Sequence, residues 1–137
     1  MRDFQPPSDD QLTAYSAGSG NALSGFPQVT SDLAFFVTPA IADVDGNGKN
    51  EANAANGVYT INAFEADGRR PDGWGKLTGG WVVGTPALGD MDGDGKYEIA
   101  VVRRDGVLLV WHTNQNATGA EWPRFGGNAR NTGVYKG

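Results

Sequence analysis

The 137-residue sequence contains no cysteine, a single histidine and no long apolar run. Without cysteine, a disulfide framework and thiolate metal sites are excluded. No apolar stretch approaches the roughly 20 residues that a membrane-spanning helix needs. The first residues, MRDFQPPSDDQ, lack the apolar core of a signal peptide. We therefore expect no membrane span, and either a protein that is not exported or a processed piece of one.

Basic residues are also in the minority, with 11 Lys and Arg against 16 Asp and Glu and a formal net charge of −5. A nucleic-acid-binding surface usually needs a basic stripe, so we expect no nucleic-acid partner. The acids are concentrated in two short segments, at 43–51 and 90–98. The acidity is therefore a property of these segments and not of a polyanionic tail.

Glycine is abundant, with 21 residues, and proline contributes 7, which indicates many turns and short strands. Residues 98–102 are rich in β-branched side chains and predict a strand. A turn at Arg104-Asp105-Gly106 and a returning strand at 107–111 follow. Residues 56–57 and 58–64 repeat the turn and the returning strand. No helix is expected, so the fold class is all-β.

Further strands are expected at 33–37 and 76–83, which gives roughly four short strands per unit. The segment 51–55, Glu-Ala-Asn-Ala-Ala, is a weak strand former. It is expected either at a sheet edge or against a partner that tolerates little side-chain volume. Residues 1–20 are biased toward Ser, Gly, Asp and Pro and are expected to be a tail or linker.

Two nine-residue acidic loops are the most informative feature of the chain. They read DVDGNGKNE from Asp43 to Glu51 and DMDGDGKYE from Asp90 to Glu98. Each has oxygen-bearing side chains at positions 1, 3, 5 and 9 and glycine at positions 4 and 6. Close carboxylates repel one another unless a cation neutralises them, and alternating oxygen ligands in a tight loop suit Ca²⁺ better than Mg²⁺, which keeps several waters.

Two other interpretations of the loops are considered. Asp and Gly are common turn residues, so each loop can also be a solvated acidic turn. An EF-hand loop needs an acid at position 12, where these loops have Ala54 and Val101. The EF-hand interpretation is therefore excluded, and the matching of two loops favours two Ca²⁺ sites over two turns.

The loops belong to a longer internal repeat. The segment VTPAIADVDGNGKNE (37–51) aligns without gaps on GTPALGDMDGDGKYE (84–98). Three aromatic residues, Phe26, Trp74 and Trp122, also recur at a spacing of 48 residues. A period in the forties is typical of propeller blades. We expect a repeat region at 21–137, with units at about 24–71 and 72–119, and a closing segment at 120–137 that begins a third unit.

The pattern Thr-Pro-Ala-aliphatic-x-Asp-x-Asp-Gly-x-Gly-x-x-Glu resembles the FG-GAP/VCBS repeat, which builds integrin-type β-propellers with calcium in blade loops. The resemblance covers residues 24–113, and the segment 121–133 resembles the ending of many secreted proteins that contain such repeats. It implies side-chain ligands at positions 1, 3, 5 and 9 and a carbonyl ligand at position 7. These residues are Asp43, Asp45, Asn47, Lys49 and Glu51 in the first loop, and Asp90, Asp92, Asp94, Lys96 and Glu98 in the second.

The sequence departs from the family in number, because propellers have roughly four to eight blades and this chain has two and a fraction. The resemblance therefore implies part of a larger or oligomeric propeller. We expect a non-catalytic calcium-binding module for protein interaction or assembly, partnered by other blades, at the cell surface, outside the cell or in the periplasm. The alternatives are part of a secreted polysaccharide-acting enzyme and a lectin-like module.

Other residues are weaker candidates. His112 is expected at the surface near the end of a strand and not as a catalytic base. The four tryptophans are expected to pack between blades, with a sugar-stacking platform as the alternative. Arg69 and Arg103 are expected to be solvated or paired with Asp67 and Asp105. Catalytic and organic-cofactor residues are not expected.

Overall fold

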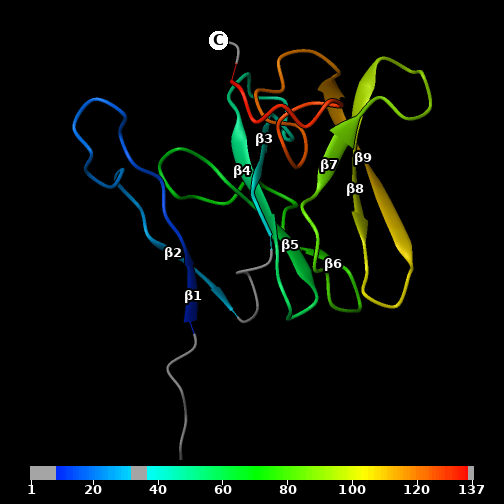
Figure 1. The fold of residues 1–137 in the computed structure, drawn as a ribbon, viewed down its shortest axis with the longest axis horizontal. Helices are drawn as coiled ribbons and strands as arrows, with labels where there is room; N and C mark the ends of the chain where they lie inside the picture. Colours follow the sequence, from blue (N-terminus) through cyan, green and yellow to red (C-terminus); the bar gives the residue numbers. More distant parts are fainter. Residues whose placement is uncertain (1–8, 32–36, 136–137) are drawn as a thin grey trace, which may run out of the picture.

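The structure, a computed structural model, describes residues 9–31 and 37–135, which form nine strands in three antiparallel sheets (Figure 1). No helix occurs in these residues, so the expected all-β class is confirmed. The same residues contain no helix that is long and apolar enough to cross a membrane. The strand expected at 33–37 falls largely outside the described residues.

The largest sheet has four strands in the order β3-β4-β5-β6. Its strands are β3 (Ala40–Ala42), β4 (Glu51–Ala55), β5 (Thr60–Phe64) and β6 (Lys76–Leu77). The strand expected at 76–83 is therefore short. The weak strand former β4 lies between β3 and β5, so its expected position at a sheet edge is wrong.

The next sheet has three strands in the order β7-β8-β9. Its strands are β7 (Ala87–Gly89), β8 (Lys96–Val102) and β9 (Leu108–Asn116). The turn at 104–106 joins β8 to β9 as expected, and β9 continues five residues beyond the expected end at 111. Each acidic loop connects the first two strands of its sheet.

The two sheets have the same register at a displacement of 47 residues. Ala42 pairs with Glu51 in one sheet, and Gly89 pairs with Glu98 in the other. The last residue of each loop is therefore the residue of the following strand that pairs with the end of the preceding one. This register places Glu51 and Glu98 at equivalent positions below their loops.

The two sheets lie side by side and share one hydrophobic core (Figure 1). Ala42, Ile61 and Ala63 of the first sheet belong to the same buried cluster as Ile99 and Val101 of the second. Small side chains on the first sheet let the second approach closely, which explains why alanine is tolerated in β3, β4 and β5. Packing against a neighbouring sheet thus outweighs the low strand propensity of β4.

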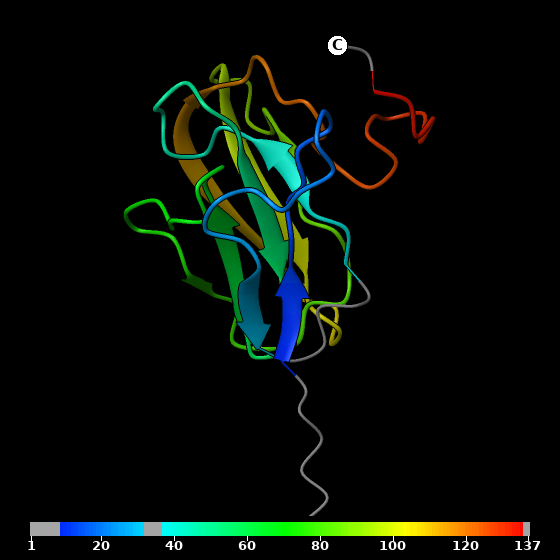
Figure 2. The same ribbon diagram turned by 90° about the vertical axis from the view of Figure 1, so that its left-hand side faces the viewer.

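A two-stranded sheet covers the other side of β3–β6 (Figure 2). It pairs β1 (Asp9–Leu12) with β2 (Gln28–Ser31). The described part of the expected tail at 1–20 therefore contains a strand. The turn before β2 is fixed by close packing, because a Cβ on Gly25 would lie 1.8 Å from the carbonyl oxygen of Asp67. The three sheets are stacked in chain order.

The segment after β9 joins the two larger sheets and does not start a third one. The backbone of Trp122 exchanges hydrogen bonds of 2.8 and 3.1 Å with Ile41 of β3. The carbonyl of Pro123 accepts a hydrogen bond of 2.8 Å from the amide of Leu88 in β7. Among the described residues after 116 there is no further strand. The expected third unit near Trp122 is therefore a bridge across the first strands of both sheets.

Candidate metal sites

Both acidic loops are wrapped around their first aspartate. Asp43 accepts hydrogen bonds from the amides of Gly46 (2.7 Å) and Gly48 (2.8 Å), one on each carboxylate oxygen. Asp90 repeats this arrangement with distances of 2.7 and 3.0 Å to the amides at the same loop positions. The glycines of both loops have φ between 82° and 90°, which residues with a side chain rarely adopt. These are Gly46, Gly48, Gly93 and Gly95.

The middle of each loop continues the same pattern. Asp45 accepts from the amide of Asn47 at 3.0 Å, and Asn47 accepts from the amide of Lys49 at 2.8 Å. In the second loop, Asp92 and Asp94 make the equivalent bonds at 3.1 and 2.8 Å. At positions 3 and 5, one oxygen of the side chain thus accepts a hydrogen bond from the backbone. Together with the first aspartate, these side chains are oriented by the amides of their own loop.

The glutamates at position 9 are buried, unlike most of the loop. Glu51 is 0% exposed and Glu98 is 1% exposed. In each case Oε2 accepts a hydrogen bond from the amide at loop position 2, Val44 at 2.8 Å and Met91 at 2.7 Å. Each glutamate therefore ties the start of the loop to the start of the following strand.

The second oxygens of these two glutamates have different surroundings. Oε1 of Glu98 lies 3.0 Å from Nδ1 of His112. Oε1 of Glu51 is buried and has no hydrogen-bond partner among the described residues. Burying an acceptor without a partner costs about 1–3 kcal/mol. The first loop therefore has a buried oxygen that no described hydrogen-bond donor satisfies.

The charge state of Glu51 reflects this environment. The pKa of its carboxyl is raised from 4.5 to about 7, chiefly by burial and in smaller part by the nearby charges of Asp45, Asp43 and Glu65. The amide of Val44 opposes the shift by stabilising the ionised form. Without a cation, Glu51 is thus half-protonated near neutral pH, although ionised carboxylate is the form that binds metal.

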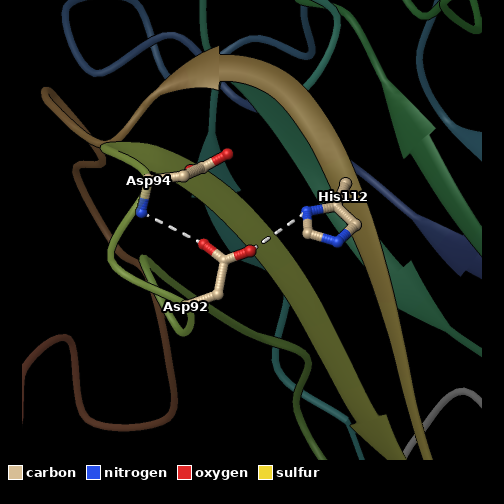
Figure 3. A group of neighbouring side chains, drawn as sticks. All are labelled: Asp92, Asp94 and His112. Carbon is tan, nitrogen blue, oxygen red and sulfur yellow. Dashed lines mark hydrogen bonds and ion pairs between the residues drawn. The ribbon is translucent and has the colours of Figure 1, made fainter.

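The structure brings together three of the expected ligands in each loop. Carboxylate oxygens of Asp43, Asp45 and Glu51 lie within 4.8 Å of one another, and so do those of the second group (Asp90, Asp92 and Glu98). Asp94 forms another such group with Asp92 and His112 (Figure 3). The side-chain oxygen of Asn47 and the backbone carbonyls of Lys49 and Lys96 remain predicted ligands.

His112 is the residue that sequence reasoning missed. Its side chain is 68% exposed, as expected for a surface residue, but its ring lies beside the second loop. Glu98 and His112 are direct cross-strand partners in the β8–β9 register. The signal was present in the sequence, because His112 follows Asp90 at the same distance as Glu65 follows Asp43.

Other candidate residues lie away from the loops or in structural roles. Arg69 and Arg103 form ion pairs with Asp67 and Asp105, which confirms one of the two expectations for them. Trp74 lines a cavity of about 510 Å³ that also reaches Asp45 and His112. Trp81 lines a different cavity and lies against Arg104 at 5.3 Å. These two tryptophans therefore do not form a common stacking platform.

The comparisons with known proteins add no assignment. No protein-family model, curated protein or solved structure matches the chain. The chemistry of the loops themselves is therefore the basis for a function. Preoriented carboxylates, a tight glycine wrap and a buried acceptor are suited to holding a hard dication and offer no nucleophile–base pair within the described loops.

Proposed function

We propose that each acidic loop binds one Ca²⁺ and that the protein is a non-catalytic, calcium-stabilised β-propeller module of FG-GAP/VCBS type. The supporting observation is Glu51, whose Oε1 is buried and unpartnered beside two further carboxylates. A bound cation would supply this oxygen with its missing partner. The proposed ligands are the ten expected loop residues, with Lys49 and Lys96 acting through their carbonyls.

Calcium fits this set of ligands better than other common dications. Each loop offers four side chains and one carbonyl, all with oxygen donors, and water would complete the 6–8 ligands that Ca²⁺ takes. Mg²⁺ demands a stricter octahedron and retains more water. Two Ca²⁺ would also change the formal net charge from −5 to −1. The affinity of such exposed loops suits the high calcium concentration outside the cell.

The role of the ion is structural in this proposal. Each loop joins the first two strands of its sheet, and the buried glutamate is paired with the last residue before the loop. Neutralising the carboxylates lets the loop and the first strands adopt one conformation. Strands β3 and β7 also hold the bridge formed by Trp122 and Pro123, so both ions stabilise the contact between sheets.

The charges of the two loops predict a difference in affinity. Position 5 is Asn47 in the first loop and Asp94 in the second, and calcium affinity rises with the number of charged ligands. We expect Asp94→Asn to weaken calcium binding at the second loop by about tenfold, near the first loop's affinity. Calorimetric titration measures both sites. Asp105→Asn, which removes one charge outside the loops, is the control; unchanged affinity in Asp94→Asn contradicts the charge argument.

We propose one face of the β7–β9 sheet as the assembly surface. Val102 pairs with Leu108 and Ala100 pairs with Val110, so these side chains share a face. Val102, Leu108 and Val110 are 54%, 60% and 44% exposed. The residues 47 positions earlier in the first sheet are all buried (Asn53, Ala55, Ile61 and Ala63). The three apolar ones belong to the hydrophobic core that the two sheets share.

The first sheet supports this proposal, because a second sheet covers its equivalent surface. Repeating that stacking step places a further sheet over Val102, Leu108 and Val110. In this proposal the covering sheet belongs to a second copy of this chain, which packs the same face against this one in a two-fold dimer. That contact joins two identical faces, unlike the head-to-tail packing of the two sheets within one chain. The partner in this proposal is therefore another blade, in agreement with the incomplete blade number.

We expect Val110→Lys to convert an oligomer into a monomer in calcium-containing buffer, because the ammonium would be buried against the second copy. Mass in solution by light scattering measures this. Leu77→Lys is the matched control, since Leu77 is 76% exposed on β6 and lies outside the proposed surface. A wild-type protein that is monomeric at high concentration contradicts self-assembly through this face.

A further inference from the structure

A polar cavity of about 410 Å³ lies between the β1–β2 sheet and the β3–β6 sheet. Thr30 of β2 lines it from one sheet, and Thr60 and Asn62 of β5 line it from the other. Asn62 points away from the shared core, because its neighbours Ile61 and Ala63 belong to that core and side chains alternate along a strand. None of the ten proposed calcium ligands lines this cavity. It is therefore separate from both acidic loops.

The wall that β5 contributes departs from the internal repeat. At a displacement of 47 residues, Thr60 corresponds to Val107 and Asn62 corresponds to Leu109. Leu109 packs against the shared core, so the second sheet has an apolar side chain at this position. Asn62 is only 4% exposed, and burying an amide is unfavourable unless its polar atoms are bonded. Packing between sheets alone therefore does not explain these polar residues, whereas a polar ligand would.

The polar side chains at the cavity form a network that leaves some of their atoms unused. The Thr60 hydroxyl donates to Oδ1 of Asn56 at 3.0 Å and accepts from Nδ2 of Asn62 at 3.3 Å. Within the described ranges, Nδ2 of Asn56 and Oδ1 of Asn62 have no hydrogen-bond partner. Thr30 is 3% exposed, and its Oγ1 is buried with no partner among the same residues. These atoms suit a ligand with hydroxyl groups, which both donate and accept hydrogen bonds.

Arg70 gives the cavity its charge. It is the only charged residue among the nine that line the cavity, and it forms no ion pair with a carboxylate of the described residues. Its guanidinium lies 5.2 Å from the ring centroid of Phe64, a contact that does not neutralise the charge. An arginine fork binds a carboxylate through two parallel hydrogen bonds. The charge therefore favours an anionic ligand.

Trp74 adds an aromatic surface to the same cavity. Small-molecule sites combine such apolar surface with a few placed polar groups, in volumes of about 300–1,000 Å³. The C–H groups of a sugar ring pack against an aromatic side chain, while its hydroxyls need donors and acceptors. The cavity at Trp74 offers both.

We propose that this cavity binds one pyranose sugar that carries a carboxylate. Arg70 binds the carboxylate, and Trp74 packs against the ring. The amides of Asn56 and Asn62 and the hydroxyl of Thr30 bind ring hydroxyls. The inference goes beyond calcium-stabilised assembly, because it gives the module a small-molecule ligand of its own.

The test is calorimetric titration of the full chain in calcium-containing buffer. The probes are the methyl glycosides of glucuronic, galacturonic and mannuronic acid, each compared with its neutral sugar, which has an alcohol in place of the carboxylate. We expect one of the acids to bind at least about tenfold more tightly than its neutral counterpart, because charge-assisted hydrogen bonds are roughly twice as strong as neutral ones. Acetate, which lacks the ring, is expected to show no measurable binding. Absence of binding by all three acids at millimolar concentration, or equal binding by the neutral sugars or by acetate, overturns the proposal.

The repeat supplies a variant that tests the cavity and is expected to fold. Asn62→Leu gives the first sheet the residue that the second sheet has at the equivalent position. We expect its affinity for the preferred acid to fall on the order of tenfold, because the amide that faces the sugar is lost. Circular dichroism and calcium titration verify that the variant is folded. Wild-type affinity in Asn62→Leu overturns the proposal.

A second variant tests the charge. Arg70→Gln is expected to bind the acid and the neutral sugar equally. Arg104→Gln is the matched control, because Arg104 also lies over an aromatic ring, 5.3 Å from the centroid of Trp81, but lines a different cavity. The control is expected to keep the preference for the acid. A preference that survives in Arg70→Gln, or is lost equally in both variants, overturns the proposal.

Sugar carboxylates also bind calcium, so the loops are the competing location. The double variant Asp43→Asn with Asp90→Asn removes a ligand from each loop. If the acids bind Asn62→Leu and Arg70→Gln as tightly as wild type and fail to bind this double variant, they bind at the loops and the cavity proposal is wrong. If the loops bind no calcium, the proposed function fails and the cavity proposal stands, because no loop ligand lines the cavity.

Discussion

Chelation of calcium is expected to lower the melting temperature of this protein by on the order of 15 °C. Each ion contributes about 2.7 kcal/mol when its free concentration is 100 times its dissociation constant. Two sites give about 5 kcal/mol, and about 3 °C per kcal/mol is typical for a domain of this size. The effect is large because both loops precede central strands of their sheets, β4 and β8.

The measurement is thermal unfolding in calcium-rich buffer and after addition of EDTA, with calcium restored in a third sample. Magnesium at the same concentration is expected to recover little of the lost stability. The double variant Asp43→Asn with Asp90→Asn is the control, because its melting temperature should no longer respond to calcium. An identical melting temperature with EDTA and with calcium in the wild-type protein contradicts the proposed role of both loops.

The local patterns predicted much of the second sheet and the shape of both loops. Alternating acids and glycines fixed the position of the loops, and the β-branched run at 98–102 predicted β8. The turn at 104–106 joined two strands that are adjacent in the sequence. Such features depend on neighbouring residues, and sequence periodicity reports them directly.

Features that depend on distant pairing were not predictable in the same way. The polar strand β1 is defined by its pairing with β2, and its own composition indicates a linker. The 48-residue spacing of aromatic residues predicted a third unit at Trp122. In the structure, the backbone of Trp122 is hydrogen-bonded to Ile41, 81 positions earlier, and forms a bridge between sheets. His112 reaches the second loop only because β9 pairs with β8. Each of these depends on tertiary contacts that override local propensity.

The pH dependence of stability is expected to change sign when calcium is added. In the calcium-free protein, burial raises the pKa of Glu51 from 4.5 to about 7. The folded state therefore holds more protons than the unfolded state between these two values, and its stability falls as pH rises through this window. A shift of this size corresponds to up to about 3 kcal/mol.

Calcium reverses the dependence because it binds the ionised carboxylate. Protons compete with the ion below about pH 7, the folded-state pKa of Glu51, so calcium stabilises the first loop more as pH rises. Urea unfolding at a series of pH values, with calcium and with EDTA, measures both slopes. Equal slopes in the two buffers would show that Glu51 does not contact the ion.

The variant Glu51→Gln gives the decisive comparison. It removes the titrating group while keeping a side chain of similar size that can accept the amide hydrogen bond of Val44. We expect the calcium-free variant to be more stable than wild type above pH 7, where wild type must bury an ionised Glu51, and to lose the calcium response of the first loop.

Glu98→Gln is the matched control, because His112 already partners Oε1 of Glu98. Without calcium, that variant should be no more stable than wild type. The substitution weakens the contact between Glu98 and His112, and both oxygens of Glu98 already have hydrogen-bond partners. A gain in both variants would indicate general relief of charge repulsion and not a buried oxygen that requires a cation.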